Sequence, residues 1–73
     1  MWGTKELRKI QALEGGNVSV ALRDGTRIDD YQLISAGRRG TRTLWLYGGQ
    51  DIFVPLNDVI DLWESRPVAS RAA

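Results

Sequence analysis

A two-residue turn signal, Asp24-Gly25, constrains the fold of this chain more than any other feature. It follows residues 17–23, in which valine and leucine alternate with serine, alanine and arginine. A period of two is typical of a strand with one buried face. Asp-Gly after such a run favours the tight turn of a β-hairpin, because both residues tolerate positive φ. The sequence therefore predicts a strand at 17–23 and a second strand that begins at Thr26.

The alternation changes phase within the second strand. Ile28 is placed to face inward, but the next apolar residues, Tyr31 and Leu33, fall on the opposite parity. A bulge or sharp bend near Asp29-Asp30 restores the inward face. Such a bend is what a small barrel needs where one strand serves two sheets.

A short helix is predicted before the first strand, over residues 4–14. Leu7, Ile10 and Leu13 recur at three-residue spacing and form an apolar stripe. The hydroxyl of Thr4 is the expected N-terminal cap. The glycine pair that follows ends the helix, because glycine adopts the left-handed conformation at little cost.

Turn residues separate three more short apolar runs, predicted as strands over residues 41–47, 52–54 and 59–63. In the first of these, Leu44 and Leu46 lie on one face and Trp45 and Tyr47 on the other. If Leu44, Leu46, Ile60 and Leu62 fill the core, then the alternate residues Trp45, Tyr47, Asp61 and Trp63 point away from it.

These segments predict an all-β fold, a small and strongly bent five-stranded barrel with a short N-terminal α-helix. A chain of 73 residues has room for one domain, expected over 1–64, with residues 65–73 as a flexible tail. A domain this small buries little surface and has no cysteine for a disulfide. We therefore expect it to be stabilised by self-association.

Composition excludes several kinds of chemistry. The chain has no cysteine and no histidine, so disulfides, thiolate metal sites and Ser–His or Cys–His catalysis are excluded. We expect no enzyme activity, no cofactor and no metal. Apolar runs fall short of the ~20 residues that span a bilayer, and charge interrupts the first residues. The expectation is a cytoplasmic protein with no membrane partner.

The order of elements resembles that of the Sm-like family, which includes the Sm, LSm and Hfq proteins, over residues 4–64. Residues 20–28, Val-Ala-Leu-Arg-Asp-Gly-Thr-Arg-Ile, are similar to the family's first motif, hydrophobic-x-Leu-x-Asn/Asp-Gly-x-x-hydrophobic. Residues 52–62, Ile-Phe-Val-Pro-Leu-Asn-Asp-Val-Ile-Asp-Leu, lie where the second motif joins strands four and five. The resemblance implies RNA binding and a homo-oligomeric ring of about five to seven subunits, with strand four of one subunit paired to strand five of the next.

The sequence also departs from the family pattern. Asp30 stands near the place of a usual glycine, and the loop at 36–40 lacks the usual base-holding Asp or Asn. Residues 54–57, Val-Pro-Leu-Asn, replace the Arg-Gly of Sm proteins and the Tyr-Lys-His of Hfq. The family's uridine pocket is therefore not carried over. A second resemblance is to SH3-like barrels, which also join their last two strands by a tight turn after a proline.

Arginines gather at two of the predicted turns. Arg38, Arg39 and Arg42 flank the turn at 37–40, and Arg27 follows the Asp-Gly turn. Guanidinium groups at loop tips suit phosphate contacts, so these four are the candidate nucleic-acid residues. The alternative is that they are solubilising charges, since a net charge of +1 gives no broad electrostatic attraction.

Apolar residues on the outer face and at the sheet edges are candidates for a subunit interface. This set contains Ile52, Phe53, Val54, Ile60, Leu62, Trp45 and Trp63. Tryptophan and tyrosine are enriched in protein contacts, and ring closure would pair both edge strands. The alternative is that the aromatic residues pack in the core.

Two functions follow as expectations. The first is a ring-forming Sm-like module that binds RNA through the arginine-rich loop. The second is a protein–protein interaction or assembly module of the SH3-like kind, without nucleic-acid binding.

Overall fold

A computed structural model describes residues 3–65, so the expected tail at 65–73 lies outside the described residues except for Ser65. The elements follow in the order α1 (Thr4–Gln11), β1 (Asn17–Leu22), β2 (Arg27–Ala36), η1 (Arg38–Gly40), β3 (Thr43–Tyr47), β4 (Asp51–Pro55), η2 (Leu56–Asp58) and β5 (Val59–Glu64). The prediction of a mostly β fold with five strands and one N-terminal helix is confirmed.

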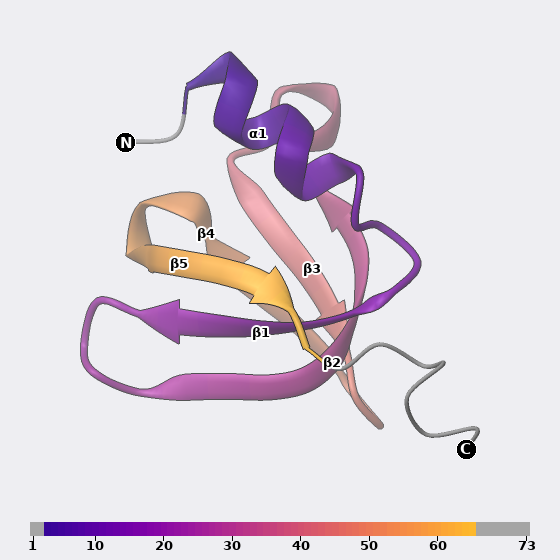
Figure 1. The fold of residues 1–73 in the computed structure, drawn as a ribbon, viewed down its shortest axis with the longest axis vertical. Helices are drawn as coiled ribbons and strands as arrows, with labels where there is room; N and C mark the ends of the chain where they lie inside the picture. The colour runs from indigo at the N-terminus through magenta and orange to yellow at the C-terminus, as the bar shows by residue number, and fades with distance from the viewer. Residues whose placement is uncertain (1–2, 66–73) are drawn as a thin grey trace.

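The five strands form one antiparallel sheet in the order β4-β3-β2-β1-β5. β4 and β5 are its edges and are not paired with each other in the described part of the chain, so the sheet is open. Figure 1 shows β1 and β5 side by side with opposite directions, while β3 crosses them at a steep angle and α1 lies across one end. The sheet is thus strongly bent, and the bend occurs in β2.

β2 contains the predicted bulge. Val18 pairs with Tyr31 and Val20 with Ile28, so one residue of β1 faces two residues of β2. One of these two, Asp30, has a φ of 63°, in the left-handed region that few residues other than glycine adopt. β2 therefore runs beside β1 and then turns toward α1 (Figure 1), which lets one strand join both parts of the sheet.

The core lies inside the bend. The largest of its fully buried side chains are Leu33, Leu44, Leu46, Val18 and Val20. Ile10 of α1 is also buried, and Leu7 and Leu13 pack against this cluster, so the predicted apolar stripe of the helix is confirmed. Leu44 and Leu46 face inward while Trp45 and Tyr47 are exposed, as the alternation of the third strand predicts.

Ile60 does not lie in the core with Leu44 and Leu46, the arrangement that the alternation of the fifth strand left open. Leu22 pairs with Val59 and Ala21 with Asp61, so a second irregularity leaves Ile60 out of the regular pairing. Val59 takes the buried position, and the side chain of Ile60 is 60% exposed. A shift of one residue moves a side chain to the other face of a strand, which the run Val59-Ile60 did not reveal.

The helix differs from its prediction at both ends. Its N-cap is Gly3, and Thr4 is the first helical residue, so the expected cap by the Thr4 hydroxyl is wrong. The helix ends at Gln11 instead of residue 14. The N–H groups of Leu13 and Glu14 bond to carbonyls three residues back, which tightens the chain into turns before β1.

β3 begins two residues later than predicted. Thr41 closes the η1 turn instead, because both its N–H and its hydroxyl donate to the Arg38 carbonyl, at 3.0 and 2.8 Å. The predicted turn at 37–40 is confirmed as the short helix η1, and the chain between the fourth and fifth predicted strands forms the short helix η2.

Candidate functional site

An open groove of about 750 Å³ lies on the outer face of the sheet, beside the loop between β2 and β3. We call it the arginine–aromatic groove. Its lining residues are Ser35, Arg38, Arg39, Thr41, Thr43, Trp45 and Phe53. Two of the four nucleic-acid candidates and two of the interface candidates therefore meet in one place. The sequence suggested these as separate features.

The aromatic wall of the groove is a cross-strand pair. Trp45 of β3 lies opposite Phe53 of β4, with ring centroids 5.6 Å apart and an interplanar angle of 31°. The side chains are 37% and 61% exposed, so both rings offer surface to a ligand. The indole N–H of Trp45 donates to Asp51 at 3.0 Å, which fixes the ring. The pair therefore offers an apolar surface, because its one polar group, the indole N–H, is already hydrogen-bonded to Asp51.

Arg38 is held by a carboxylate from another part of the chain. Its Nε donates to Glu14 Oε2 at 3.0 Å and its Nη2 to Glu14 Oε1 at 2.6 Å, a two-point ion pair. The Arg38 hydrogen bond is the largest cause that lowers the pKa of Glu14, against the opposing effect of burial. The same hydrogen bond raises the pKa of Arg38. Both groups are therefore charged at neutral pH.

Arg39 takes an unusual backbone conformation. Its φ of 58° follows that of Gly37 at 61° and precedes that of Gly40 at 77°, so the loop has three left-handed residues. Left-handed backbone at a non-glycine residue is strained and persists where the surroundings enforce it. The loop thereby brings the Arg39 side chain to the lining of the groove.

The hydroxyl groups of the groove and the carboxylate that supports it were not among the residues predicted from the sequence. Thr41, Thr43 and Trp45 recur at a spacing of two, so the face that they share was visible in the pattern. Ser35 joins this row because it pairs with Trp45 across β2 and β3. Glu14 had no such signal, since it lies 24 residues from Arg38 in the chain.

The remaining arginine candidates lie elsewhere. Arg27 forms an ion pair with Asp29 at 2.8 Å, and its guanidinium lies 5.2 Å from the centre of the Trp63 ring. Arg42 is exposed, and its backbone carbonyl accepts the N–H of Leu56 at 2.8 Å. Neither Arg27 nor Arg42 is among the residues that line the groove.

The interface candidates divide by burial. Val54 belongs to the core of the single chain, and Ile52 and Leu62 pack against that core. Trp63 is half-buried beneath Arg27. Phe53 and Ile60, on the edge strands β4 and β5, are the most exposed of the set at 61% and 60%.

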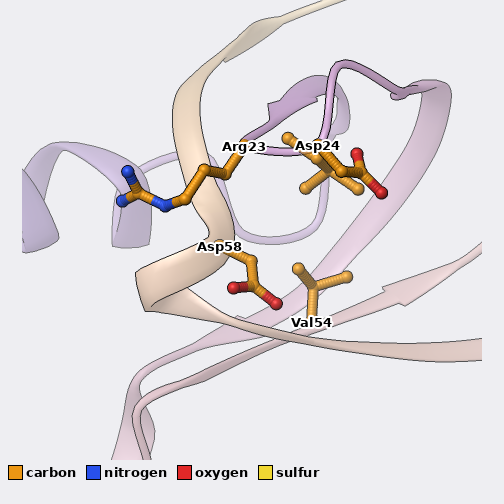
Figure 2. A pocket seen from close by; sticks show the side chains of 5 residues that line it. Arg23, Asp24, Val54 and Asp58 are labelled. Carbon is orange, nitrogen blue, oxygen red and sulfur yellow. The ribbon is translucent and has the colours of Figure 1, made fainter.

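A second pocket, of about 280 Å³, lies between the β1–β2 turn and η2, and is lined by Leu22, Arg23, Asp24, Val54 and Asp58. Figure 2 shows Arg23 directed away from the carboxyl groups of Asp24 and Asp58. The Arg23 guanidinium donates two hydrogen bonds to the Asn57 carbonyl, at 3.1 and 2.8 Å. Asp24 accepts the hydroxyl and the N–H of Thr26 at 2.6 and 2.9 Å. The hydroxyl bond is the largest cause that lowers the pKa of Asp24. These contacts close the hairpin turn, and we assign this pocket no function.

Over residues 3–65, no cluster of three or more acidic side chains is arranged to hold a metal ion. The same stretch contains no helix with the length and apolar character to cross a bilayer.

Comparison with protein-family models, with characterised proteins and with solved structures finds no match for this chain. Its function is therefore argued from the geometry alone.

Proposed function

We propose that this protein binds single-stranded RNA in the arginine–aromatic groove. The observation that carries the proposal is that Arg38 and Arg39 line the same groove as the exposed rings of Trp45 and Phe53. Single-strand binding combines positive charge along the backbone with aromatic rings on which bases stack. This groove offers both within one open surface.

Each part of the groove has a physical role. A base stacks on Phe53, the more exposed ring of the pair, and the guanidinium groups contact the adjoining phosphates. The hydroxyl groups of Ser35, Thr41 and Thr43 supply further hydrogen bonds. Because the indole N–H is engaged by Asp51, the aromatic pair has no free donor with which to read a base. We therefore expect weak sequence preference.

An Sm-like barrel is part of this proposal. The order β4-β3-β2-β1-β5 and the bend in β2 support it. So does Asp30, which stands near the place of the family's usual glycine and has the positive φ that glycine tolerates best. Aspartate is one of the few other residues that adopt this conformation readily.

A homo-oligomeric ring, closed by pairing of β4 in one subunit with β5 in the next, is also part of the proposal. Both strands have unpaired edges in the described chain, and unpaired edges favour association. Phe53 and Ile60 add exposed apolar surface on these strands. Closure into a ring would satisfy both edges of every subunit.

A protein–protein interaction module is the second candidate. The exposed apolar surface of Phe53, Trp45 and Ile60 favours it, because aromatic residues often anchor protein contacts. The near-neutral net charge of +1 also favours it over strong nucleic-acid binding.

The test is binding of a fluorescent single-stranded RNA, about 12 nucleotides long, measured by anisotropy between about 50 and 200 mM salt. We expect binding that weakens as salt rises. Arg39→Gln removes one phosphate contact and should reduce the slope of log K against log salt by about 0.7. Phe53→Ala removes a stacking surface and should weaken binding by about 1–3 kcal/mol with little change in slope.

Arg8→Gln is the matched control, because it removes the same charge from an exposed residue of α1 that lies outside the groove. Equal losses in Arg8→Gln and Arg39→Gln would mean that binding is a general charge effect. No binding at about 50 mM salt would exclude the RNA proposal and favour the protein–protein module.

A further inference from the structure

Arg38 has N–H donors that Glu14 does not use. Glu14 engages the Nε and one hydrogen of Nη2, so both hydrogens of Nη1 and the second hydrogen of Nη2 remain. The guanidinium group is planar and rigid, so a carboxylate that holds one edge sets the direction of the others. Arg38 also lines the arginine–aromatic groove, and its side chain is 54% exposed while bound to Glu14.

Glu14 is itself held firmly. Its side chain is only 19% exposed, and Oε2 accepts the N–H of Ala36 at 2.9 Å in addition to the Nε of Arg38. Gln11, one helical turn earlier, donates to the carbonyl of Ala36 at 2.8 Å. The end of β2 is therefore bonded to α1 and to the turn after it. A carboxylate fixed in this way is a rigid support, unlike the freely moving partners of most surface ion pairs.

We propose that Glu14 is a positioning residue for the groove, and that it acts by orienting the guanidinium of Arg38 toward a bound phosphate. This inference rests on the proposed RNA binding. Glu14 does not contact the ligand; it holds the Nε edge of Arg38, and the Nη1 edge meets the phosphate. A carboxylate that fixes the geometry of a ligand-binding group is a common device in binding sites.

Glu14→Gln should weaken RNA binding even though it removes a negative charge. Glu14 is a negative charge beside a site for a negatively charged ligand, so electrostatics alone predicts that Glu14→Gln tightens RNA binding. Orientation of Arg38 predicts the opposite, because glutamine cannot form the two-point charged pair that fixes the guanidinium. The direction of the change separates the two effects.

The experiment measures the affinity of the same RNA for six proteins at one salt concentration: the wild type, Glu14→Gln, Glu6→Gln, Arg38→Ala, Arg38→Lys and the double variant Glu14→Gln/Arg38→Ala. We expect Glu14→Gln to weaken binding about threefold to tenfold. This loss is at or below the lower end, about tenfold, of the range found when a supporting carboxylate is removed. Glu6→Gln makes the same charge change on α1 outside the groove, and should leave binding equal or slightly tighter.

The double variant tests whether Glu14 acts through Arg38. In the Arg38→Ala background, Glu14→Gln should cause no further loss of affinity, and removal of its negative charge should leave binding equal or slightly tighter. A merely structural role would produce the same loss as in the wild type. Arg38→Lys keeps the charge and leaves in place the hydrogen bond that the Ala36 N–H donates to Glu14. It should weaken binding as Glu14→Gln does, because lysine has no planar fork.

Three results would overturn the inference: tighter or unchanged binding in Glu14→Gln, an equal loss in the Arg38→Ala background, or wild-type affinity in Arg38→Lys. Wild-type affinity in Arg38→Lys would overturn the inference even if Glu14→Gln does not fold. Failure of the inference leaves wild-type RNA binding and its dependence on Arg39 and Phe53 intact. Failure of the proposed function removes wild-type binding altogether, and the inference with it.

Discussion

The residue at position 48 must be glycine because the ring of Tyr31 leaves no space for a side chain there. A Cβ atom at this residue would lie 2.7–2.8 Å from three atoms of the Tyr31 ring, closer than real Cβ contacts. Tyr31 packs against the core, so its ring cannot swing away freely. The requirement at Gly48 is therefore space, since its φ is not positive.

We expect Gly48→Ala to lower the free energy of unfolding by about 1–3 kcal/mol, the usual range for an overpacked site. Urea denaturation measures the change. Gly16→Ala is the control, because a Cβ atom there meets only the Leu13 carbonyl at 3.5 Å, an ordinary contact, and its φ is not positive. Equal stability in the two variants would show that the Tyr31 ring yields at no cost.

Glu14 makes stability depend on pH. Its pKa in the folded chain lies below its ordinary value of 4.5, chiefly because of the hydrogen bond from Arg38. A lowered pKa stabilises the fold above the unfolded pKa, and this contribution is lost as pH falls through the folded pKa. We expect the wild type to exceed Glu14→Gln in stability at pH 7, and the difference to shrink below about pH 4.5. Urea denaturation of both proteins at pH 7 and below about pH 4.5 measures this difference in stability. A difference that does not change with pH would contradict the role of the ionised Glu14 carboxylate.

At the scale of the elements, the bulge in β2 has the largest effect on shape. Asp30 provides the left-handed residue, and its Oδ1 accepts hydrogen bonds from Asn17 Nδ2 at 3.0 Å and from Ser65 Oγ at 2.9 Å. These bonds tie the bulge to the start of β1 and to the residue after β5. The bend of the whole sheet thus depends on one short irregular segment.

Asp30→Val should destabilise the protein by about 1–3 kcal/mol, because a β-branched residue resists positive φ and removes the acceptor. Asp30→Asn should cost much less, since asparagine tolerates this conformation and keeps Oδ1. Thermal unfolding followed by circular dichroism compares the two. If Asp30→Val is as stable as Asp30→Asn, the bulge does not need the left-handed conformation.

At the scale of the whole molecule, the sheet has two unpaired edges, β4 and β5, within the residues that the structure describes. We expect light scattering after size exclusion to give a uniform particle of about five to seven subunits at low and high salt. Ile60→Lys should reduce that mass and leave the fold intact, because Ile60 is 60% exposed in the single chain and such substitutions change stability little. Tyr47→Lys, on the interior strand β3, is the control and should keep the mass of the wild type. A monomeric wild type would refute the ring and favour the interaction module.

The helix and the strands of this protein can be predicted from the sequence, because their signals are local. Alternation at Val18 and Val20, the Asp24-Gly25 turn and the phase change near Asp29-Asp30 depend only on residues that are close in the chain. The bounds of the helix were mispredicted and the orientation of Ile60 stayed open, because hydrogen bonds around α1 and a register shift against β1 decide them.

The candidate site is formed by strand pairing and by contacts between elements, which the sequence does not reveal. Strand pairing places Phe53 opposite Trp45, and the β2–β3 loop brings Arg39 to the same groove. The ion pair that joins Glu14 to Arg38 spans 24 positions of the chain. Contacts at such separations depend on how the sheet bends and which strands become neighbours, and no local pattern of residue types encodes them.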